Sequence, residues 1–258
     1  MLVMVVAAGC ATAPAPGAGA GTSASTSSAA PAPARAATKG DPWEAFNRKV
    51  FAFNEAIDDA VLQPVAKAYR DVVPEPVRAG IGNAIGNVGD VWSAANQFAQ
   101  GKGQAGLEMS LRFLTNSFFG IVGIFDVASD LGIERQSEDF GQTLGRWGIG
   151  AGPYIVLPLL GPSSLRETVA LPVDRKASLS SLAFEGSTSY AVTALEVVHT
   201  RARLLAAGQL VNQIALDRYS FVRDAYLARR RSLVHDGNPP ELPDDSAAGS
   251  AADKPSQK

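Results

Sequence analysis

Apolar residues recur at steps of three and four along much of the chain between residues 41 and 235, a spacing that places side chains on one face of an α-helix. We expect a first helix from Asp41, an N-cap residue followed by Pro42, and a break at Pro64. Because Trp43 and Phe51 lie away from its apolar stripe, this helix is either deeply buried or faces lipid over part of its surface. The stripe consists of Phe46, Val50, Phe53, Ile57 and Val61.

A second helical pattern covers residues 76–100 despite the interior glycines Gly80, Gly82, Gly86 and Gly89. Each interior glycine destabilises a helix by about 1 kcal/mol relative to alanine. Close packing against a neighbouring backbone and a kink in the helix would both account for them, and the pattern leaves both open.

The densest apolar stretch runs from Leu107 to Leu131 and is interrupted by Arg112, Asn116 and Asp126. Its uninterrupted part is shorter than the roughly 20 residues that span a bilayer, which excludes a conventional transmembrane helix. A helix in the core of the domain is the default interpretation, and a segment that dips into one membrane leaflet is the alternative.

Residues 148–166 combine an apolar run with Pro153, Pro158 and Pro162 and with neighbouring glycines, so no continuous helix is expected there. An apolar turn of this kind is unfavourable in water. We therefore expect it to pack into the core or to enter a membrane.

Two further helices are expected at residues 190–207 and 209–233, and the second ends in the basic cluster Arg229, Arg230 and Arg231. Positive charge suits a helix C-terminus because it balances the negative end of the helix dipole. A solvated helix end is one interpretation, and contact with anionic lipid head groups is the other. Together these segments predict an all-α domain with helices broken by glycine and proline.

Cys10, the only cysteine, follows an apolar run and the small residues Ala7, Ala8 and Gly9, as at a bacterial lipoprotein processing site. We expect a signal peptide over residues 1–9 and a lipid-modified Cys10. The segment lacks the basic residues that open a signal peptide, which indicates a start codon further upstream.

Low-complexity segments flank the predicted domain, which covers residues 41–235. Residues 11–40 are mostly Ala, Pro, Gly, Ser and Thr and cannot bury enough apolar surface to fold, so residues 10–40 are expected to form a lipidated, disordered tether. A similar, mildly acidic composition predicts a disordered tail over residues 236–258.

Charge and chemistry argue against a nucleic-acid-binding protein and against an enzyme. The chain carries 23 basic and 25 acidic residues, with no long run of either sign. His199 and His235 are the only histidines, and the sequence shows no nucleophile elbow, phosphate-binding loop or set of zinc or calcium ligands. We expect no catalytic residues, no metal and no cofactor.

Three long segments resemble the MlaA (VacJ) lipoprotein family of Gram-negative outer membranes. They are DPWEAFNRKVFAFNEAIDDAVLQPVAKAYRDVVPEPVR, RFLTNSFFGIVGIFDVAS and EDFGQTLGRWGIGAGPYIVLPLLGPSSLRE. The resemblance as a whole extends over nearly the entire predicted domain, from Asp41 to about Arg231. The resemblance implies an all-helical ring embedded in one membrane leaflet, with an amphipathic channel that carries misplaced phospholipids from the outer leaflet toward a soluble periplasmic lipid carrier. It also implies a neighbouring trimeric porin and a role in outer-membrane lipid asymmetry.

The resemblance also implies candidate residues for the lipid channel or for membrane insertion. The first-helix motif corresponds to Phe46, Asn47, Arg48, Phe51, Phe53 and Asn54. The glycine and proline motif near the channel corresponds to Gly148, Gly152, Pro153, Tyr154, Pro158, Gly161 and Pro162. The basic cluster Arg229, Arg230 and Arg231 is a candidate contact to head groups or to the porin.

A non-enzymatic lipid-transport component is the leading hypothesis, and it agrees with the missing catalytic set because lipid transfer breaks no covalent bond. One alternative is a structural lipoprotein that only scaffolds a porin or the envelope. The other is a lipase with an unrecognised site. The expected location is the periplasmic face of the Gram-negative outer membrane.

Overall fold

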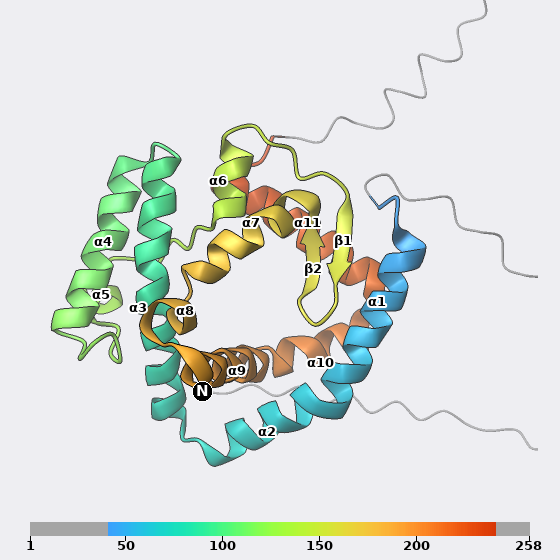
Figure 1. The fold of residues 1–258 in the computed structure, drawn as a ribbon, viewed down its shortest axis with the longest axis horizontal. Coiled ribbons are helices and arrows are strands. Elements are labelled where there is room, and N and C mark those ends of the chain that lie inside the picture. Colours follow the sequence, from blue (N-terminus) through green and yellow to red (C-terminus); the bar gives the residue numbers. More distant parts are fainter. Residues whose placement is uncertain (1–40, 241–258) are drawn as a thin grey trace, which may run out of the picture. The chain divides into compact units, whose positions relative to one another are not determined.

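The computed structural model describes residues 41–240, which lie within one unit of the chain, Ala37–Lys258. Helices dominate (Figure 1), and the all-α fold class is confirmed apart from one small antiparallel hairpin. The elements are α1 (Glu44–Ile57), the π-helical segment η1 (Asp58–Leu62), α2 (Gln63–Val72), α3 (Glu75–Ala99), α4 (Gly103–Phe118), α5 (Val127–Asp130), α6 (Phe140–Arg146), β1 (Tyr154–Leu157), β2 (Gly161–Ser164), α7 (Leu165–Lys176), α8 (Leu179–Ala183), α9 (Gly186–Arg203), α10 (Leu205–Ile214) and α11 (Arg218–Val234).

The chain stays helical from α1 through η1 into α2, because the boundary residues keep right-handed helical backbone angles. The break expected at Pro64 is therefore wrong. Pro64 lies in the first turn of α2, directly after the π-helical segment. The wider π-helical turn accommodates the missing N–H group of the proline without ending the helix.

Helix α3 is continuous and packs along α4. Cβ atoms at Gly80 and Gly82 would lie only 3.0 Å from the Ile124 side chain and 2.8 Å from Nε2 of His199. A Cβ contact of 2.8 Å is essentially never seen and one of 3.0 Å is unusually tight, so close packing accounts for both glycines.

Contacts between elements close a ring, of which the hairpin and α7 form a part (Figure 1). Helix α1 packs on β1, and β2 packs on α7 and α11. Helices α7 and α11 pack on α6, and α6 in turn packs on α3. Helix α3 contacts α9, and α9 packs on α2, which leads back to α1 through η1. The ring-like arrangement expected from the resemblance is confirmed.

The C-terminal part contains more breaks than the apolar spacing predicted. The helix expected at residues 209–233 is split, because Ala215 is extended and Asp217 caps a new helix by accepting a hydrogen bond from the Tyr219 N–H group at 3.2 Å. Helix α7 was not predicted, although Ser164 and Glu167 have the spacing of a capping box. The Ser164 side chain accepts a hydrogen bond from the Glu167 N–H group.

Polar side chains occupy many buried positions, and large apolar side chains occupy the surface. Arg112 is the largest of the fully buried side chains, whereas Phe118, Phe119 and Val122 are 79%, 77% and 75% exposed. Extended apolar surfaces of this kind mark contact with a membrane or a partner. The default interpretation of residues 107–131 as a core helix is wrong, because the polar interruptions of that stretch face inward and its apolar side chains face outward.

Arg112 lies beside the exposed apolar turn that connects α4 to α5. Its guanidinium, fully buried, lies 3.3 Å from Oδ2 of Asp90 and 2.6 Å from Oδ1 of Asp126. It also donates to Oγ of Ser129 and to the carbonyl oxygen of Ile133. We call these residues the Arg112 network. The network ties α3 and α4 to the segment around α5.

The Arg112 network predicts an acid-sensitive contribution to stability. Burial favours the protonated form of Asp126, but hydrogen bonds from Ser129, Asn116 and Arg112 outweigh it and lower its pKa from 3.8 to about 2. Because the folded pKa is the lower one, the stabilisation is complete above about pH 4 and is lost as the pH falls toward about 2. Its full size is about 2 kcal/mol.

Unfolding curves of the wild type and Asp126→Asn measured from about pH 6 to about pH 2 check this expectation. The two stabilities should converge as the pH falls, because the asparagine side chain of the variant cannot titrate. Asp90, whose pKa burial raises, is present in both proteins and contributes equally to each curve. A difference that stays constant with pH contradicts the prediction.

Candidate functional site

The two motifs identified in the sequence meet where α1 packs on the hairpin, a contact that we call the α1–hairpin junction. Asn47 is fully buried and donates from Nδ2 to the Tyr154 carbonyl oxygen at 3.1 Å, while its Oδ1 accepts from the Val156 N–H group at 2.9 Å. Asn54 repeats the pattern with the Leu157 carbonyl oxygen at 2.9 Å and the Leu159 N–H group at 2.8 Å.

The spacing of the two asparagines matches the hairpin geometrically. Asn47 and Asn54 lie two helical turns apart on one face of α1. Asn47 brackets Ile155 in β1, and Asn54 brackets Pro158 in the turn that follows the strand. The Asn47 amide therefore acts as one residue of an additional strand beside β1, and the Asn54 amide holds the turn at the end of the strand. The junction fixes the position of the hairpin relative to the ring.

The other residues of the first-helix motif have different surroundings. Arg48 donates to both carboxylate oxygens of Asp217, at 3.2 and 2.7 Å, and stacks 4.3 Å from the centre of the Tyr219 ring. Phe51 packs edge-on against Tyr219. By contrast, the side chains of Phe46 and Phe53 are 55% and 50% exposed, so these two are the members of the motif available to lipid.

The expectation that Asp41 caps the first helix is wrong. Helix α1 begins at Glu44, and Asp41 is buried beside α11 and the hairpin. Its carboxylate accepts hydrogen bonds from Nδ2 of Asn47 at 2.8 Å and from the Tyr219 hydroxyl group. Asp41 therefore orients the amide of Asn47.

Gly148 terminates α6. Its φ angle is +92°, its N–H group donates to the Gly145 carbonyl oxygen, and the Ile149 N–H group donates to the Leu144 carbonyl oxygen, both at 3.0 Å. This is the pattern of a Schellman C-cap, which favours glycine. No atom lies within 4 Å of the position that a Cβ would occupy, so close packing does not explain the residue.

The rest of the glycine and proline motif builds the hairpin. Gly152 and Gly161 have positive φ angles of 69° and 82°, and the Pro153 carbonyl oxygen accepts from the Leu165 N–H group at 3.0 Å. Tyr154 is fully buried, and Pro162 pairs with Val156 across the strands. The loop that contains Pro158 is exposed. The expected apolar turn is thus half buried, through β1, and half exposed, through its tip.

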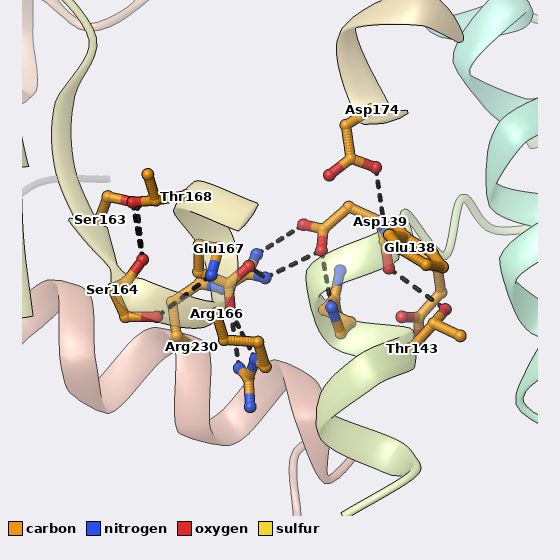
Figure 2. A network of polar contacts seen from close by, with 12 residues as sticks. Glu138, Asp139, Thr143, Ser163, Ser164, Arg166, Glu167, Thr168, Asp174 and Arg230 are labelled. Carbon is orange, nitrogen blue, oxygen red and sulfur yellow. Dashed lines mark hydrogen bonds and ion pairs between the residues drawn. The ribbon is translucent and has the colours of Figure 1, made fainter. Parts of the chain in front are cut away.

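Arg230 is the centre of an ionic cluster next to the hairpin (Figure 2), which we call the Arg230 cluster. It donates to both oxygens of Asp139, at 2.6 and 2.8 Å, and to Oε2 of Glu167. Glu167 also pairs with Arg166 at 2.6 Å. Burial works against ionisation of Asp139, but its hydrogen bonds with Arg230 dominate and lower its pKa.

Tyr226 and Arg230 of α11 line two cavities. One, of about 280 Å³, includes Leu157 and Leu160 of the hairpin together with charged residues of the Arg230 cluster. The other, of about 400 Å³, is lined by Gly148 and the glycine segment that follows it. Both cavities combine apolar and charged walls, which suits an amphiphilic molecule.

The basic cluster at the end of α11 does not behave as one unit. The interpretation of this cluster as a solvated helix end is wrong for Arg230, because its guanidinium forms ion pairs with Asp139 and Glu167. Arg229 is exposed, and Arg231 is half-buried and donates to the Pro240 carbonyl oxygen. Contact with head groups or a porin stays a prediction for these two.

Sequence reasoning missed the acidic half of the Arg230 cluster. Asp139 and Glu167 lie at the starts of α6 and α7, where Asp139 accepts a hydrogen bond from the Gln142 N–H group at 2.8 Å. The capping pattern of each helix start was a usable signal. Their pairing with Arg230 was not, because the partners are far apart in the sequence.

No group of His, Cys, Asp and Glu side chains suited to a metal ion occurs within residues 41–240. In the same range, no helix is long and apolar enough to cross a membrane. Cys10 lies outside the described residues.

A closed ring of helices with large apolar side chains exposed and ion pairs buried between its elements defines a class of all-α domains with an unusually apolar surface. The family model described as MlaA lipoprotein matches residues 39–233. The chain belongs to the MlaA lipoprotein family.

Curated relatives and a solved structure agree with this assignment. The intermembrane phospholipid transport system lipoprotein MlaA of Escherichia coli K12 is 36% identical over 215 residues, which cover 81% of this chain and 85% of the relative. The Haemophilus influenzae protein of the same name is 33% identical and covers 82% and 87%. A solved structure, described as the structural basis for maintenance of bacterial outer membrane lipid asymmetry, matches with a TM-score of 0.67 and 36% identity over 76% of this chain and all of its own.

Proposed function

We propose that this chain removes misplaced phospholipids from the outer leaflet of the Gram-negative outer membrane and passes them through an amphipathic channel in the ring to a periplasmic carrier. In this proposal the ring lies in one leaflet beside a trimeric porin, and a lipid on Cys10 anchors the chain at the periplasmic side. The single observation that carries the proposal is the inverted distribution of polarity, with ionic clusters buried between the elements of the ring and large apolar side chains exposed at its surface.

The turn after α4 supports insertion into one leaflet. Its exposed side chains are apolar, yet the N–H groups of Phe119, Val122, Gly123 and Phe125 all donate to carbonyl oxygens of the same segment. Backbone groups that enter hydrocarbon need internal partners because lipid supplies none. These four N–H groups of the apolar turn meet the requirement without a partner outside the segment.

Lipid transfer from nanodiscs to a purified periplasmic carrier tests the proposal. We expect phospholipid to reach the carrier only when the chain is present, with no release of fatty acid. Fatty acid release favours a lipase. Absence of both transfer and release favours the scaffold that the sequence left as an alternative.

A charge in the exposed turn should weaken membrane binding. Val122 is 75% exposed with a φ angle of 56°, a conformation that aspartate tolerates better than valine. Val122→Asp should therefore fold normally but bind vesicles about tenfold more weakly, because a carboxylate is unfavourable at the edge of hydrocarbon. Co-sedimentation of Cys10→Ser chains with vesicles measures this without the anchor.

Val122→Asn is the matched control, because asparagine fits the same backbone angles without a charge. It should bind at least severalfold more tightly than Val122→Asp. If both variants bind like the wild type, the turn does not enter the membrane.

Gly148 is predicted to affect lipid passage. The left-handed backbone angle destabilises alanine and lysine alike, by about 1–2 kcal/mol, but only lysine places a long, charged side chain beside the cavity that Gly148 lines. Gly148→Lys and Gly148→Ala should therefore melt at similar temperatures, while Gly148→Lys transfers lipid several times more slowly. Equal transfer by the two variants removes Gly148 from the channel.

A further inference from the structure

A separate cavity of about 340 Å³ lies where α2, α3 and α9 meet, and it contains a concentration of basic side chains. It shares no residue with the cavities beside the Arg230 cluster. Glu75 is the one carboxylate residue among those that line it. Its basic residues and its other hydrogen-bonding residues are Tyr69, Arg78, Asn83, Arg135, His199 and Arg203.

Positive charge in this cavity exceeds negative charge. Arg135 is neutralised by Asp90, with Nε 2.8 Å from Oδ1. Arg78 and Arg203 form no ion pair within the part of the chain that the structure describes, and Nε of Arg78 is a buried donor without a hydrogen-bond partner. A buried donor without a partner costs free energy, so such groups usually have a partner in the functional state.

His199 supplies an independent indication of a ligand. The residue is 95% buried, being 5% exposed, and its Nδ1 lies 3.1 Å from the Tyr69 hydroxyl oxygen. Its Nε2 is buried without a partner and lies over Gly82, another residue of the cavity wall. Burial and then the charges of Arg203 and Arg78 lower the pKa of His199, and an anion between them reverses the effect of those charges.

We propose that this cavity binds a phosphate-bearing anion. Two guanidinium groups give the charge and the forked donors that match phosphate oxygens, and His199, oriented by Tyr69, adds a donor from Nε2. Residues Glu75, Arg78 and Ala79 place the first turn of α3 at the wall, and the positive end of the helix dipole favours an anion there. A phospholipid head group and free phosphate share this chemistry; the lipid source rests on the function proposed above.

Calorimetric titration of the full chain in detergent tests this inference with three probes: inorganic phosphate, dihexanoyl phosphatidylglycerol and dihexanoylglycerol, which lacks phosphate. The double variant Arg78→Gln/Arg203→Gln should bind phosphate-containing probes about 100-fold more weakly, since each charge-assisted contact is worth about tenfold. Arg70→Gln is the control, because Arg70 is exposed on α2 outside the cavity. It should bind like the wild type.

Thermal melting distinguishes recognition from a structural role. The double variant removes two unpaired like charges, so its melting temperature should be unchanged or higher. A lower melting temperature together with unchanged binding overturns the inference, as does binding of dihexanoylglycerol alone or of no probe. Tighter binding of phosphatidylglycerol than of phosphate identifies the head group, and equal binding identifies free phosphate.

Lipid transfer measured on the same preparations separates the two proposals. Normal transfer without phosphate binding overturns the cavity inference and leaves the proposed function intact. Phosphate binding without lipid transfer supports the cavity inference and overturns the proposed function.

Discussion

Replacing Asn47 with alanine is expected to lower the free energy of unfolding by at least about 3 kcal/mol. The substitution removes the partner of the Val156 N–H group and of the Tyr154 carbonyl oxygen, and each buried group left unsatisfied costs about 1–3 kcal/mol. The Asp41 carboxylate also loses the Asn47 amide but keeps the hydrogen bond from the Tyr219 hydroxyl group. Because the same contacts position the hairpin, lipid transfer should fall with stability. Chemical denaturation in detergent measures the first effect.

Two variants sharpen this expectation. Asn54→Ala removes the equivalent bonds at a less buried site, so it should cost about 1–2 kcal/mol. Asn47→Asp keeps the shape but replaces the donor by a second carboxylate next to Asp41, and it should destabilise at least as much as alanine. An Asn47→Ala protein as stable as Asn54→Ala contradicts the role given to the junction.

Replacing Arg112 with methionine should destabilise the domain by about 3–5 kcal/mol, the typical cost of removing one partner of a buried ion pair. Asp90 is 1% exposed and keeps only Arg135 as a partner, while Asp126 loses its closest cation. The apolar turn should also loosen from α3, so faster proteolysis between residues 118 and 126 is expected.

Arg135→Met provides the matched comparison, because it removes the other partner of Asp90 from a position that is 28% exposed. Its cost should be about 1–2 kcal/mol, as solvent compensates part of the loss. Adding Asp90→Asn to Arg112→Met should recover part of the stability, since the uncompensated charge disappears. Additive effects of the two substitutions contradict the predicted coupling.

Local chemistry was sufficient to predict several elements. Helical spacing of apolar residues predicted α1, α3 and α9, because a helix needs one apolar face and the sequence repeats it every three or four residues. The density of proline and glycine in residues 148–166 excluded a continuous helix there, and the hairpin confirms that exclusion. The capping boxes at Asp139 and Ser164 were present as signals and were overlooked.

Which face of an element points inward could not be decided from apolar spacing. The stretch from Leu107 to Leu131 has the composition of a core helix, yet Arg112, Asn116 and Asp126 turn inward because they pair with one another and with α3. Apolar periodicity identifies two faces but does not say whether water or lipid lies outside. That choice depends on where the buried polar groups find partners.

The sequence by itself determined the helical character of the domain, the two motifs on α1 and in the hairpin, and the resemblance that identified the family, since all three depend on residues close together along the chain. Only the tertiary structure decided that Asn47 and Asn54 hold the hairpin, that Arg230 is paired internally, and that Arg78, His199 and Arg203 share a cavity. The contacts that decide these points join residues far apart in the sequence, from 63 positions for Arg230 and Glu167 to 130 for Tyr69 and His199. A hydrogen bond or ion pair depends on distance in space, and no local pattern encodes it.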